Sequence, residues 1–125
     1  MAAKDKYHEH VTYMDKVEKY EKIIIDYFEA FAERRNKNPN STKIQVIADT
    51  QRKHYQLVMI GWNEYRYTHI CLFHLDIIGG KIWVQENRTE VLIDEELLER
   101  GIPKHDIVPG LLHPEERKDT EYAVA

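Results

Sequence analysis

The stretch from Tyr55 to Gln85 constrains the fold most, because it holds two long apolar runs and then a Gly79-Gly80 pair. Both runs are rich in β-branched and aromatic residues, which favour strands, and two glycines between such runs indicate a hairpin turn. A further apolar run, Lys81 to Asn87, follows the glycines. This part of the chain therefore predicts antiparallel strands joined by tight turns.

Four strands are predicted in all, at residues 43–49, 55–62, 67–77 and 81–87. Their connections are too short for parallel crossovers, so the strands form an antiparallel meander. Alternation places Cys71, Phe73 and Leu75 on one face of the third strand and Ile70 and Leu72 on the other, and both faces are apolar. A sheet with one face in water would show a polar side. We therefore expect both faces to be covered, one of them by a second layer or another subunit.

Apolar residues recur at three- and four-residue steps from Asp15 to Phe31, which predicts a long helix with Asp15 as its N-cap. Residues 94–101 predict a short acidic helix that starts at Asp94 and ends at Gly101. Residues 1–13 lack an apolar period and are expected to form a flexible extension before one domain, residues 14–125. The expected fold class is α+β: a long N-terminal helix packed on a four-stranded antiparallel β-meander, with a short second helix and a C-terminal segment.

Composition narrows the classes of function. The 125 residues carry a net charge of −4, which disfavours direct binding to nucleic acid, since neutralising phosphates needs clustered Lys and Arg. Cys71 is the only cysteine, as is usual in a reducing compartment. No run of about 18 apolar residues predicts a membrane span. We therefore expect a cytoplasmic protein without membrane contact.

Two pairs of side chains on the third strand could carry chemistry. His74 and Asp76 lie two residues apart, so they share a face and could orient a proton transfer or offer two metal ligands. Because no third ligand stands at a recognisable spacing, we interpret them as a polar pair and predict neither a metal nor a cofactor. His69 and Cys71 are expected on the opposite face, where a thiol among apolar neighbours indicates packing.

Other candidates are aromatic or lie in the C-terminal segment. Trp62, Trp83 and two tyrosines could reach the surface and form an interface, although core filling explains them equally well. His113 precedes Pro114 and two glutamates, which is typical of the start of a helix and matches no zinc or hydrolase spacing.

Three blocks of the sequence resemble the XisI-like proteins, the fdxN-element excision controlling factors. Residues 54–63 (HYQLVMIGWN) resemble the family signature H-Y-Q-L-x-x-x-G-W, and residues 74–85 (HLDIIGGKIWVQ) are similar to its H-x-D-I-x-x-G-K-I-W-I-Q. Residues 101–124 are similar to the family's ending, which starts G-V-P-K-x-D-I-V. The likeness extends from Met14 to the C-terminus, with Pro109, Leu112 and Tyr122 as departures from the usual pattern.

The resemblance implies an α+β fold and a role in programmed excision of a DNA element, in which a recombinase performs the strand chemistry and a XisH protein acts alongside. It carries no established catalytic residues. Our leading hypothesis is a non-enzymatic accessory protein that binds a XisH-like partner and associates with itself. A small enzyme or ligand-binding protein and a weak DNA binder remain alternatives. Binding candidates are His54, Trp62, Trp83, Gln85 and Asp106. Candidates for catalysis are His74, Asp76, His113 and Arg117.

Overall fold

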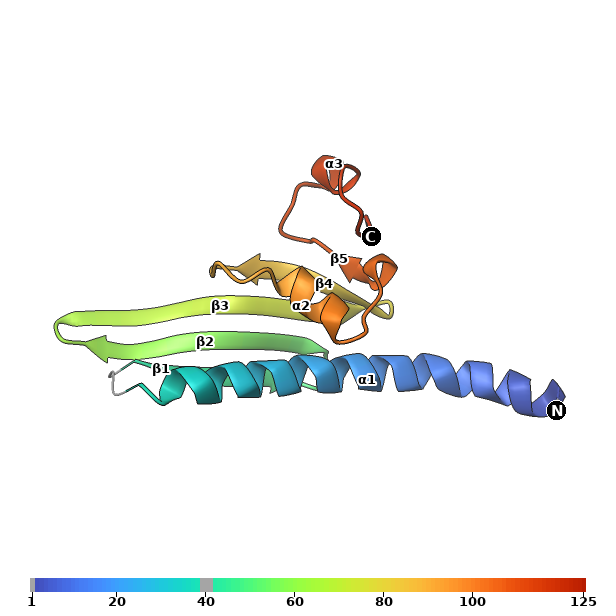
Figure 1. The fold of residues 1–125 in the computed structure, drawn as a ribbon, viewed down its shortest axis with the longest axis horizontal. Helices are drawn as coiled ribbons and strands as arrows, with labels where there is room; N and C mark the ends of the chain where they lie inside the picture. The colour runs from blue at the N-terminus through green and yellow to red at the C-terminus, as the bar shows by residue number, and fades with distance from the viewer. Residues whose placement is uncertain (1, 39–41) are drawn as a thin grey trace.

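A long helix, α1 (Ala2–Asn36), lies along a five-stranded sheet in the computed structural model (Figure 1). The structure describes the backbone of residues 2–38 and 42–125 and the side chains of residues 15–38 and 42–125. The predicted N-cap at Asp15 is wrong, because the helix continues back to Ala2. No Pro or Gly precedes Asp15, so nothing in the sequence stops a helix there. The division of the chain at residue 13 stays a prediction.

The sheet has the strand order β1-β2-β3-β4-β5, and the first four strands pair antiparallel in sequence order. This confirms the predicted meander. The fifth strand was not predicted and pairs parallel to β4, with Ile82 opposite Ile107. Two residues are too few to show an alternation in the sequence. The strands are β1 (Lys43–Asp49), β2 (His54–Asn63), β3 (Arg66–Ile78), β4 (Lys81–Asn87) and β5 (Ile107–Val108).

The turn between β3 and β4 consists of the two predicted glycines. Gly79 has φ 59° and Gly80 has φ 77°, and Ile78 pairs with Lys81 across the turn. Two consecutive left-handed residues define a type I′ turn, whose twist matches that of the strands it joins. The hairpin prediction is therefore confirmed.

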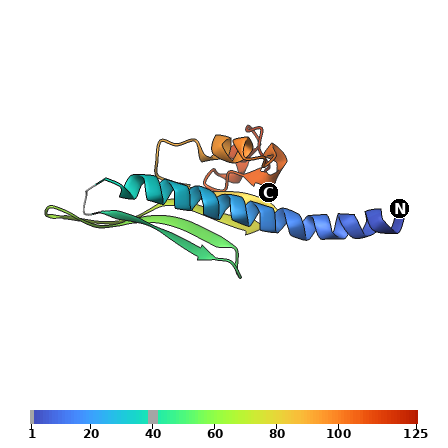
Figure 2. The same cartoon turned by 60° about the horizontal axis from the view of Figure 1, so that its bottom comes forward.

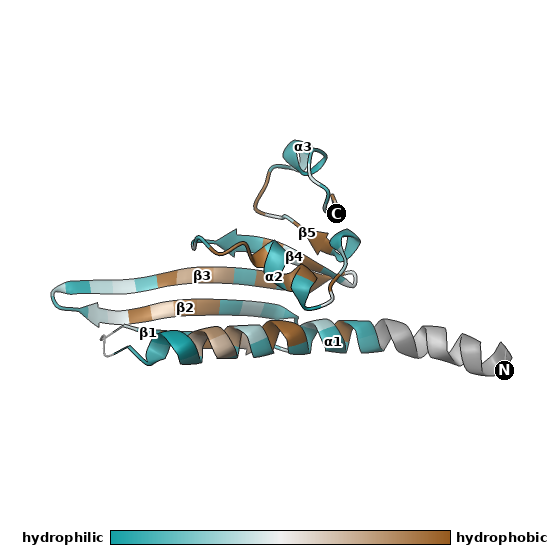
Figure 3. Ribbon diagram, viewed as in Figure 1, coloured by the Kyte–Doolittle hydropathy of each residue, from teal (hydrophilic) through white to brown (hydrophobic). Residues whose placement is uncertain are grey.

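One face of the sheet forms the core, against α1 and α2 (Ile93–Glu99), which lie on the same side of the sheet (Figure 2). The fully buried Phe73 of β3 stacks on Phe28 at 5.9 Å between ring centroids and meets Phe31 edge-on at 5.6 Å. Figure 3 shows apolar stretches of α1, β2 and β3 in brown where these elements run alongside one another. Burial of these rings helps to hold α1 on the sheet.

The boundaries of α2 match the prediction at one end only. The helix starts at Ile93 after an N-cap Leu92 that makes no side-chain cap bond, so the predicted cap at Asp94 is wrong. Gly101 follows the C-cap with φ 96°, and its N–H donates to the Leu98 carbonyl at 3.0 Å. The next N–H donates to Leu97 at 3.1 Å, which completes a Schellman motif. The predicted role of Gly101 is confirmed.

A β-bulge in the middle of β3 changes the predicted assignment of side chains to faces. Leu57 pairs with Phe73 but Val58 pairs with Cys71, so Leu72 is an extra residue without a partner on β2. Beyond it the alternation reverses. Cys71 therefore faces away from Phe73, and the prediction that the two share a face is wrong. His69 and Cys71 lie on the same face as His74 and Asp76, not on the opposite one.

The chain ends with η1 (Lys104–Asp106), strand β5 and a short helix, α3 (Pro114–Arg117), beside the β4 edge of the sheet (Figure 1). Pro114 is the first residue of α3, as the sequence predicts, and His113 caps it. The Leu111 N–H donates to the Val84 carbonyl at 2.9 Å, which fixes the segment to β4. Among the residues described, none of the helices is both long and apolar enough to cross a membrane.

Candidate functional site

The face of the sheet opposite α1 and α2 is covered by neither helix (Figure 2). We call it the open face. Its side chains alternate along β2 and β3 with those of the core. Polar groups gather at the end of the face near the Gly79-Gly80 turn, and aromatic groups gather at the other end. The residues that define the open face are Ile47, His54, Gln56, Val58, Ile60, Trp62, Tyr67, His69, Cys71, His74, Asp76, Trp83 and Gln85.

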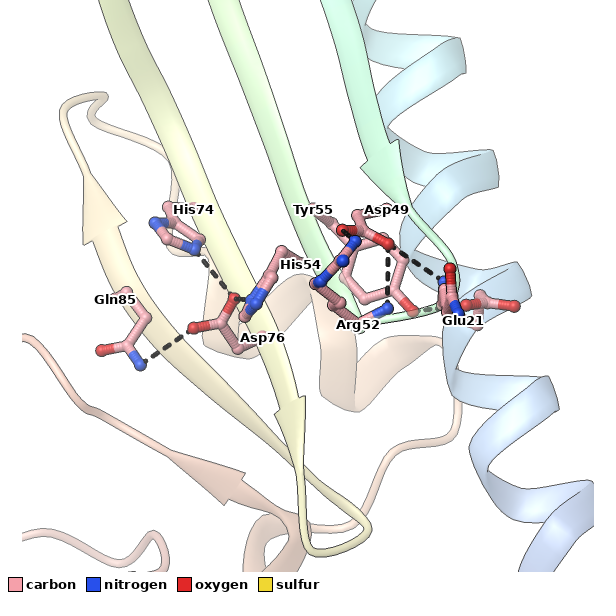
Figure 4. A network of polar contacts seen from close by, with 9 residues as sticks. Glu21, Asp49, Arg52, His54, Tyr55, His74, Asp76 and Gln85 are labelled. Carbon is pink, nitrogen blue, oxygen red and sulfur yellow. Dashed lines mark hydrogen bonds and ion pairs between the residues drawn. The ribbon is translucent and has the colours of Figure 1, made fainter.

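The polar end is built around the carboxylate of Asp76 (Figure 4). The Nδ1 atom of His54 lies 2.7 Å from its Oδ1 atom, and the Nε2 atom of His74 lies 2.8 Å from the same oxygen. Gln85 Nε2 donates to the other oxygen, Oδ2, at 3.2 Å. We call these four side chains the His-Asp-His cluster.

The backbone explains why these residues meet. His54 and Asp76 are register partners across β2 and β3, and His74 lies two residues before Asp76 on the same face. Gln85 reaches Asp76 because a second bulge makes it an extra residue on β4: His74 pairs with Glu86, but Leu75 pairs with Val84. All four groups are therefore held on paired strands.

The cluster combines a buried carboxylate with accessible imidazoles. Asp76 is buried, whereas the His54 side chain is 51% exposed and that of His74 is 28% exposed. Burial alone would raise the pKa of Asp76, but hydrogen bonds from His54, His74 and Gln85 outweigh it and lower the pKa below its ordinary value. Asp76 is thus ionised at neutral pH, and the cluster can orient imidazoles or bind a cation.

The aromatic end of the open face carries Trp62 and Tyr67, which pair across β2 and β3. Their ring centroids lie 5.2 Å apart, and the residues are 56% and 51% exposed. Tyr65, in the adjoining turn, is 97% exposed. The open choice between surface and core is thereby decided for these three residues: they lie at the surface.

Trp83 and Arg117 form a separate contact at the β4 edge. The Arg117 guanidinium lies 5.1 Å from the Trp83 ring centroid. Its N–H groups donate to the carbonyl oxygens of Leu112, Gly110 and Val124 at 3.1, 3.2 and 3.3 Å. Arg117 therefore organises the C-terminal segment.

The other predicted site residues do not join the His-Asp-His cluster. His113 accepts a hydrogen bond from the Glu115 N–H at 3.2 Å and acts as the cap of α3. The contacts do not unite His74, Asp76, His113 and Arg117 in one pocket. His74 and Asp76 touch each other. His113 and Arg117 make their hydrogen bonds within the C-terminal segment. Spacing in the sequence does not bring His54 together with Asp76, because that contact depends on strand register.

Asp106 lies buried on the core side of the molecule, where it faces α1. Its Oδ2 atom is 2.9 Å from Lys16 Nζ and accepts a hydrogen bond from the Tyr20 hydroxyl. Burial would raise the pKa of Asp106, but the Tyr20 and Lys16 contacts outweigh it and hold the pKa below its ordinary value. These contacts give Asp106 a structural role, joining η1 to α1.

The fold and the cluster define a small α+β protein with a single sheet, packed on one face by a long helix and carrying a His-Asp-His cluster on the other. The family model described as XisI protein matches residues 14–124, and the chain belongs to this family. A search of the curated proteins gave no match.

Two solved structures from Anabaena variabilis ATCC 29413 share the fold. A XisI-like protein is 37% identical with a TM-score of 0.80, covering 87% of this chain and 99% of its own. The fdxN element excision controlling factor XisI is 33% identical with a TM-score of 0.74, covering 88% of this chain and 99% of its own. The family predicted from the three sequence blocks is thereby confirmed.

Proposed function

We propose that this chain is an accessory factor in the programmed excision of a DNA element by site-specific recombination, and that it acts by binding a XisH-like protein. Membership of the XisI family supports the proposal, as does the 33% identity to a protein named as an fdxN element excision controlling factor. In this role the protein works in the cytoplasm, where the recombinase meets its DNA.

The exposed Trp62–Tyr67 pair is the observation that carries the proposed mode of action. Large aromatic rings held in contact with water are unfavourable, whereas Trp and Tyr dominate the energetics of protein interfaces. This end of the face therefore offers an apolar anchor to another protein.

The reactivity of the Cys71 thiol and the net charge of the chain also favour a protein partner. Burial raises the pKa of the Cys71 thiol, which keeps it protonated and poorly nucleophilic. The net charge of −4 gives DNA phosphates little to bind. A protein partner fits both properties better than a covalent reaction or a DNA duplex does.

Co-expression with a tagged XisH-like protein, followed by size-exclusion chromatography with light scattering, tests the proposal. We expect co-elution of the wild type and its loss in the Trp62→Ala/Tyr67→Ala variant. Leu92→Ala is the matched control, because Leu92 is 59% exposed and precedes α2, away from the pair. Failure of the wild type to co-elute under mild salt would count against the proposal. A gel shift at low salt would instead favour DNA binding.

We infer that the same aromatic end also supports self-association in the absence of the partner. The Trp62 and Tyr67 rings remain exposed in a single chain, so a second copy can cover them. Sedimentation velocity at micromolar concentration should show a species heavier than the 14.9 kDa monomer. Monomers alone at that concentration would overturn this inference and leave the partner proposal standing.

A further inference from the structure

We propose that His54, His74 and Asp76 bind a divalent first-row transition metal ion, of which Zn²⁺ is the natural probe. The proposal goes beyond the role in excision and does not depend on it, since the cluster lies apart from the Trp62–Tyr67 pair.

The spacing of the three side chains fits one ion. Each offers one ligand atom, and the three atoms lie within 4.8 Å of one another. Zinc bonds to nitrogen and oxygen are about 2.0–2.2 Å long, so the ligand atoms around a tetrahedral ion lie roughly 3.3 Å apart. The two nitrogen–oxygen distances of 2.7 and 2.8 Å therefore need to open by roughly half an ångström. Small side-chain rotations are sufficient for that.

The donor set selects the class of metal. Two imidazole nitrogens and a carboxylate oxygen suit zinc, iron, cobalt and nickel, whereas calcium and magnesium take oxygen ligands. The carboxylate of Asp76 is the anionic ligand of the set. The third ligand, His54, comes from the neighbouring strand, which is why the spacing of His74 and Asp76 in the sequence predicted no metal.

A supporting contact and rigid strands hold the ligands in place. Gln85 Nε2 donates to the Asp76 oxygen that faces away from the imidazoles, at 3.2 Å, and so fixes the carboxylate. Such outer contacts orient metal ligands and strengthen binding. All three ligands stand on β2 and β3, the pair of strands with the longest register in the sheet.

Three protein ligands leave at least one coordination position free. His54 is half exposed and the open face is not covered by α1 or α2, so the free position faces solvent. Structural zinc sites are closed by four protein ligands, whereas three ligands and an open position are typical of sites where a water or an outside group binds the metal. The cluster is therefore a site at which a metal can present a water or accept a group from another molecule.

The experiment uses the full chain carrying His8→Ala and His10→Ala, which removes two further imidazoles near the N-terminus from the titration. Chelator-treated protein is titrated with Zn²⁺ by calorimetry and with Co²⁺ by visible absorption. We expect one ion per chain with a dissociation constant of about 1 μM or lower, and Co²⁺ bands typical of a four- or five-coordinate ion. His54→Ala, His74→Ala and Asp76→Asn should each weaken binding by about 100-fold or more.

His69→Ala and His105→Ala are the matched controls, because both imidazoles are exposed and lie outside the three ligands. Each should keep its affinity within about twofold of the parent. The proposal is overturned if the parent shows no saturable binding at about 100 μM Zn²⁺, or if His54→Ala binds as tightly as the parent. The half-exposed His54 side chain is removable without disturbing the core, so this variant stays informative even if Asp76→Asn does not fold. If the parent shows no saturable binding, the cluster is a polar cross-strand contact only.

Discussion

Tyr20 of α1 donates a hydrogen bond from its hydroxyl group to the carboxylate of Asp106, which lies 86 residues further along the chain. Lys16, one helical turn before Tyr20, pairs with the same oxygen at 2.9 Å. The C-terminal third of the protein is thus attached to the first helix by a buried charge. Family resemblance suggested Asp106 as a binding residue, and its contacts instead explain it as part of the fold.

Asp106→Asn should lower the free energy of unfolding by about 2 kcal/mol at pH 7, the usual scale for a hydrogen bond to a charged group. The amide can still accept from Tyr20, but it cannot pair with the Lys16 ammonium. Urea denaturation followed by circular dichroism measures the change. Asp26→Asn is the control: its pair with Lys22 is exposed, so it should cost no more than about 0.5 kcal/mol.

The difference between Asp106→Asn and the wild type should depend on pH. The folded-state pKa of Asp106 lies below its ordinary value of 3.8, so its contribution is fully present above that value and is lost as the pH falls through the folded pKa. Denaturation curves should therefore give a constant difference between about pH 5 and 7 and a shrinking one below about pH 4. A difference that grows towards acid would contradict this assignment.

Phe73→Ala should lower the free energy of unfolding by about 4 kcal/mol. The ring is fully buried between Phe28 and Phe31, and its removal leaves a cavity that the strands cannot close. Phe73→Leu fills part of that space and should cost about 1–2 kcal/mol. The measurement is again chemical denaturation at pH 7. Tyr65→Ala, at the 97% exposed turn position, should stay within about 0.5 kcal/mol. Equal losses for the two Phe73 variants would show that the core tolerates the cavity.

How far the sequence predicts this fold depends on whether a signal is local. The strands β1 and β4 have the bounds predicted, and the Gly79-Gly80 turn has the expected conformation, because apolar alternation and paired glycines act over a few residues. The early start of α1 was missed, since residues 2–14 lack both an apolar stripe and a stop signal. Strand β5 was missed because its two residues pair with a strand far back in the sequence.

The candidate site was harder to predict, because it depends on two bulges. The extra residue Leu72 reverses the alternation of β3, and no glycine marks the position. Regular two-residue alternation therefore predicted the wrong face for Cys71. The extra residue Gln85 on β4 brings its amide to Asp76 in a way that no spacing rule shows. The motif blocks named His54, His74, Asp76 and Gln85 as candidates, but only the register of β2, β3 and β4 brings them together.

Gly110→Ala should disturb the His-Asp-His cluster from a distance. A Cβ atom at Gly110 would lie 2.6 Å from Gln85 Oε1 and 3.0 Å from Trp83 Cε3, so the Gln85 side chain must move and release Asp76. We expect the free energy of unfolding to fall by about 1 kcal/mol. The side-chain amide signals of Gln85 should also shift in the NMR spectrum.

A double-mutant cycle separates this effect from general damage. Gln85→Ala removes the group that the new methyl meets, so Gly110→Ala should cost less in the Gln85→Ala background than in the wild type. The coupling should reach about 0.5 kcal/mol or more, which is the range seen for residues in contact. Strictly additive losses would mean that the two residues do not interact.

Arg117→Lys should loosen the C-terminal segment while leaving the sheet intact. The planar guanidinium donates to three carbonyl oxygens and lies over the Trp83 ring, and an ammonium group cannot reproduce that fork. Amide hydrogen exchange should accelerate about tenfold at Leu111 and Ala123, whose N–H groups bond to Val84 and Ile107. Lys118→Ala is the control, because its exposed pair with Glu115 contributes little and exchange should not change. Unchanged protection in Arg117→Lys would mean that the two backbone bonds hold the segment without the guanidinium.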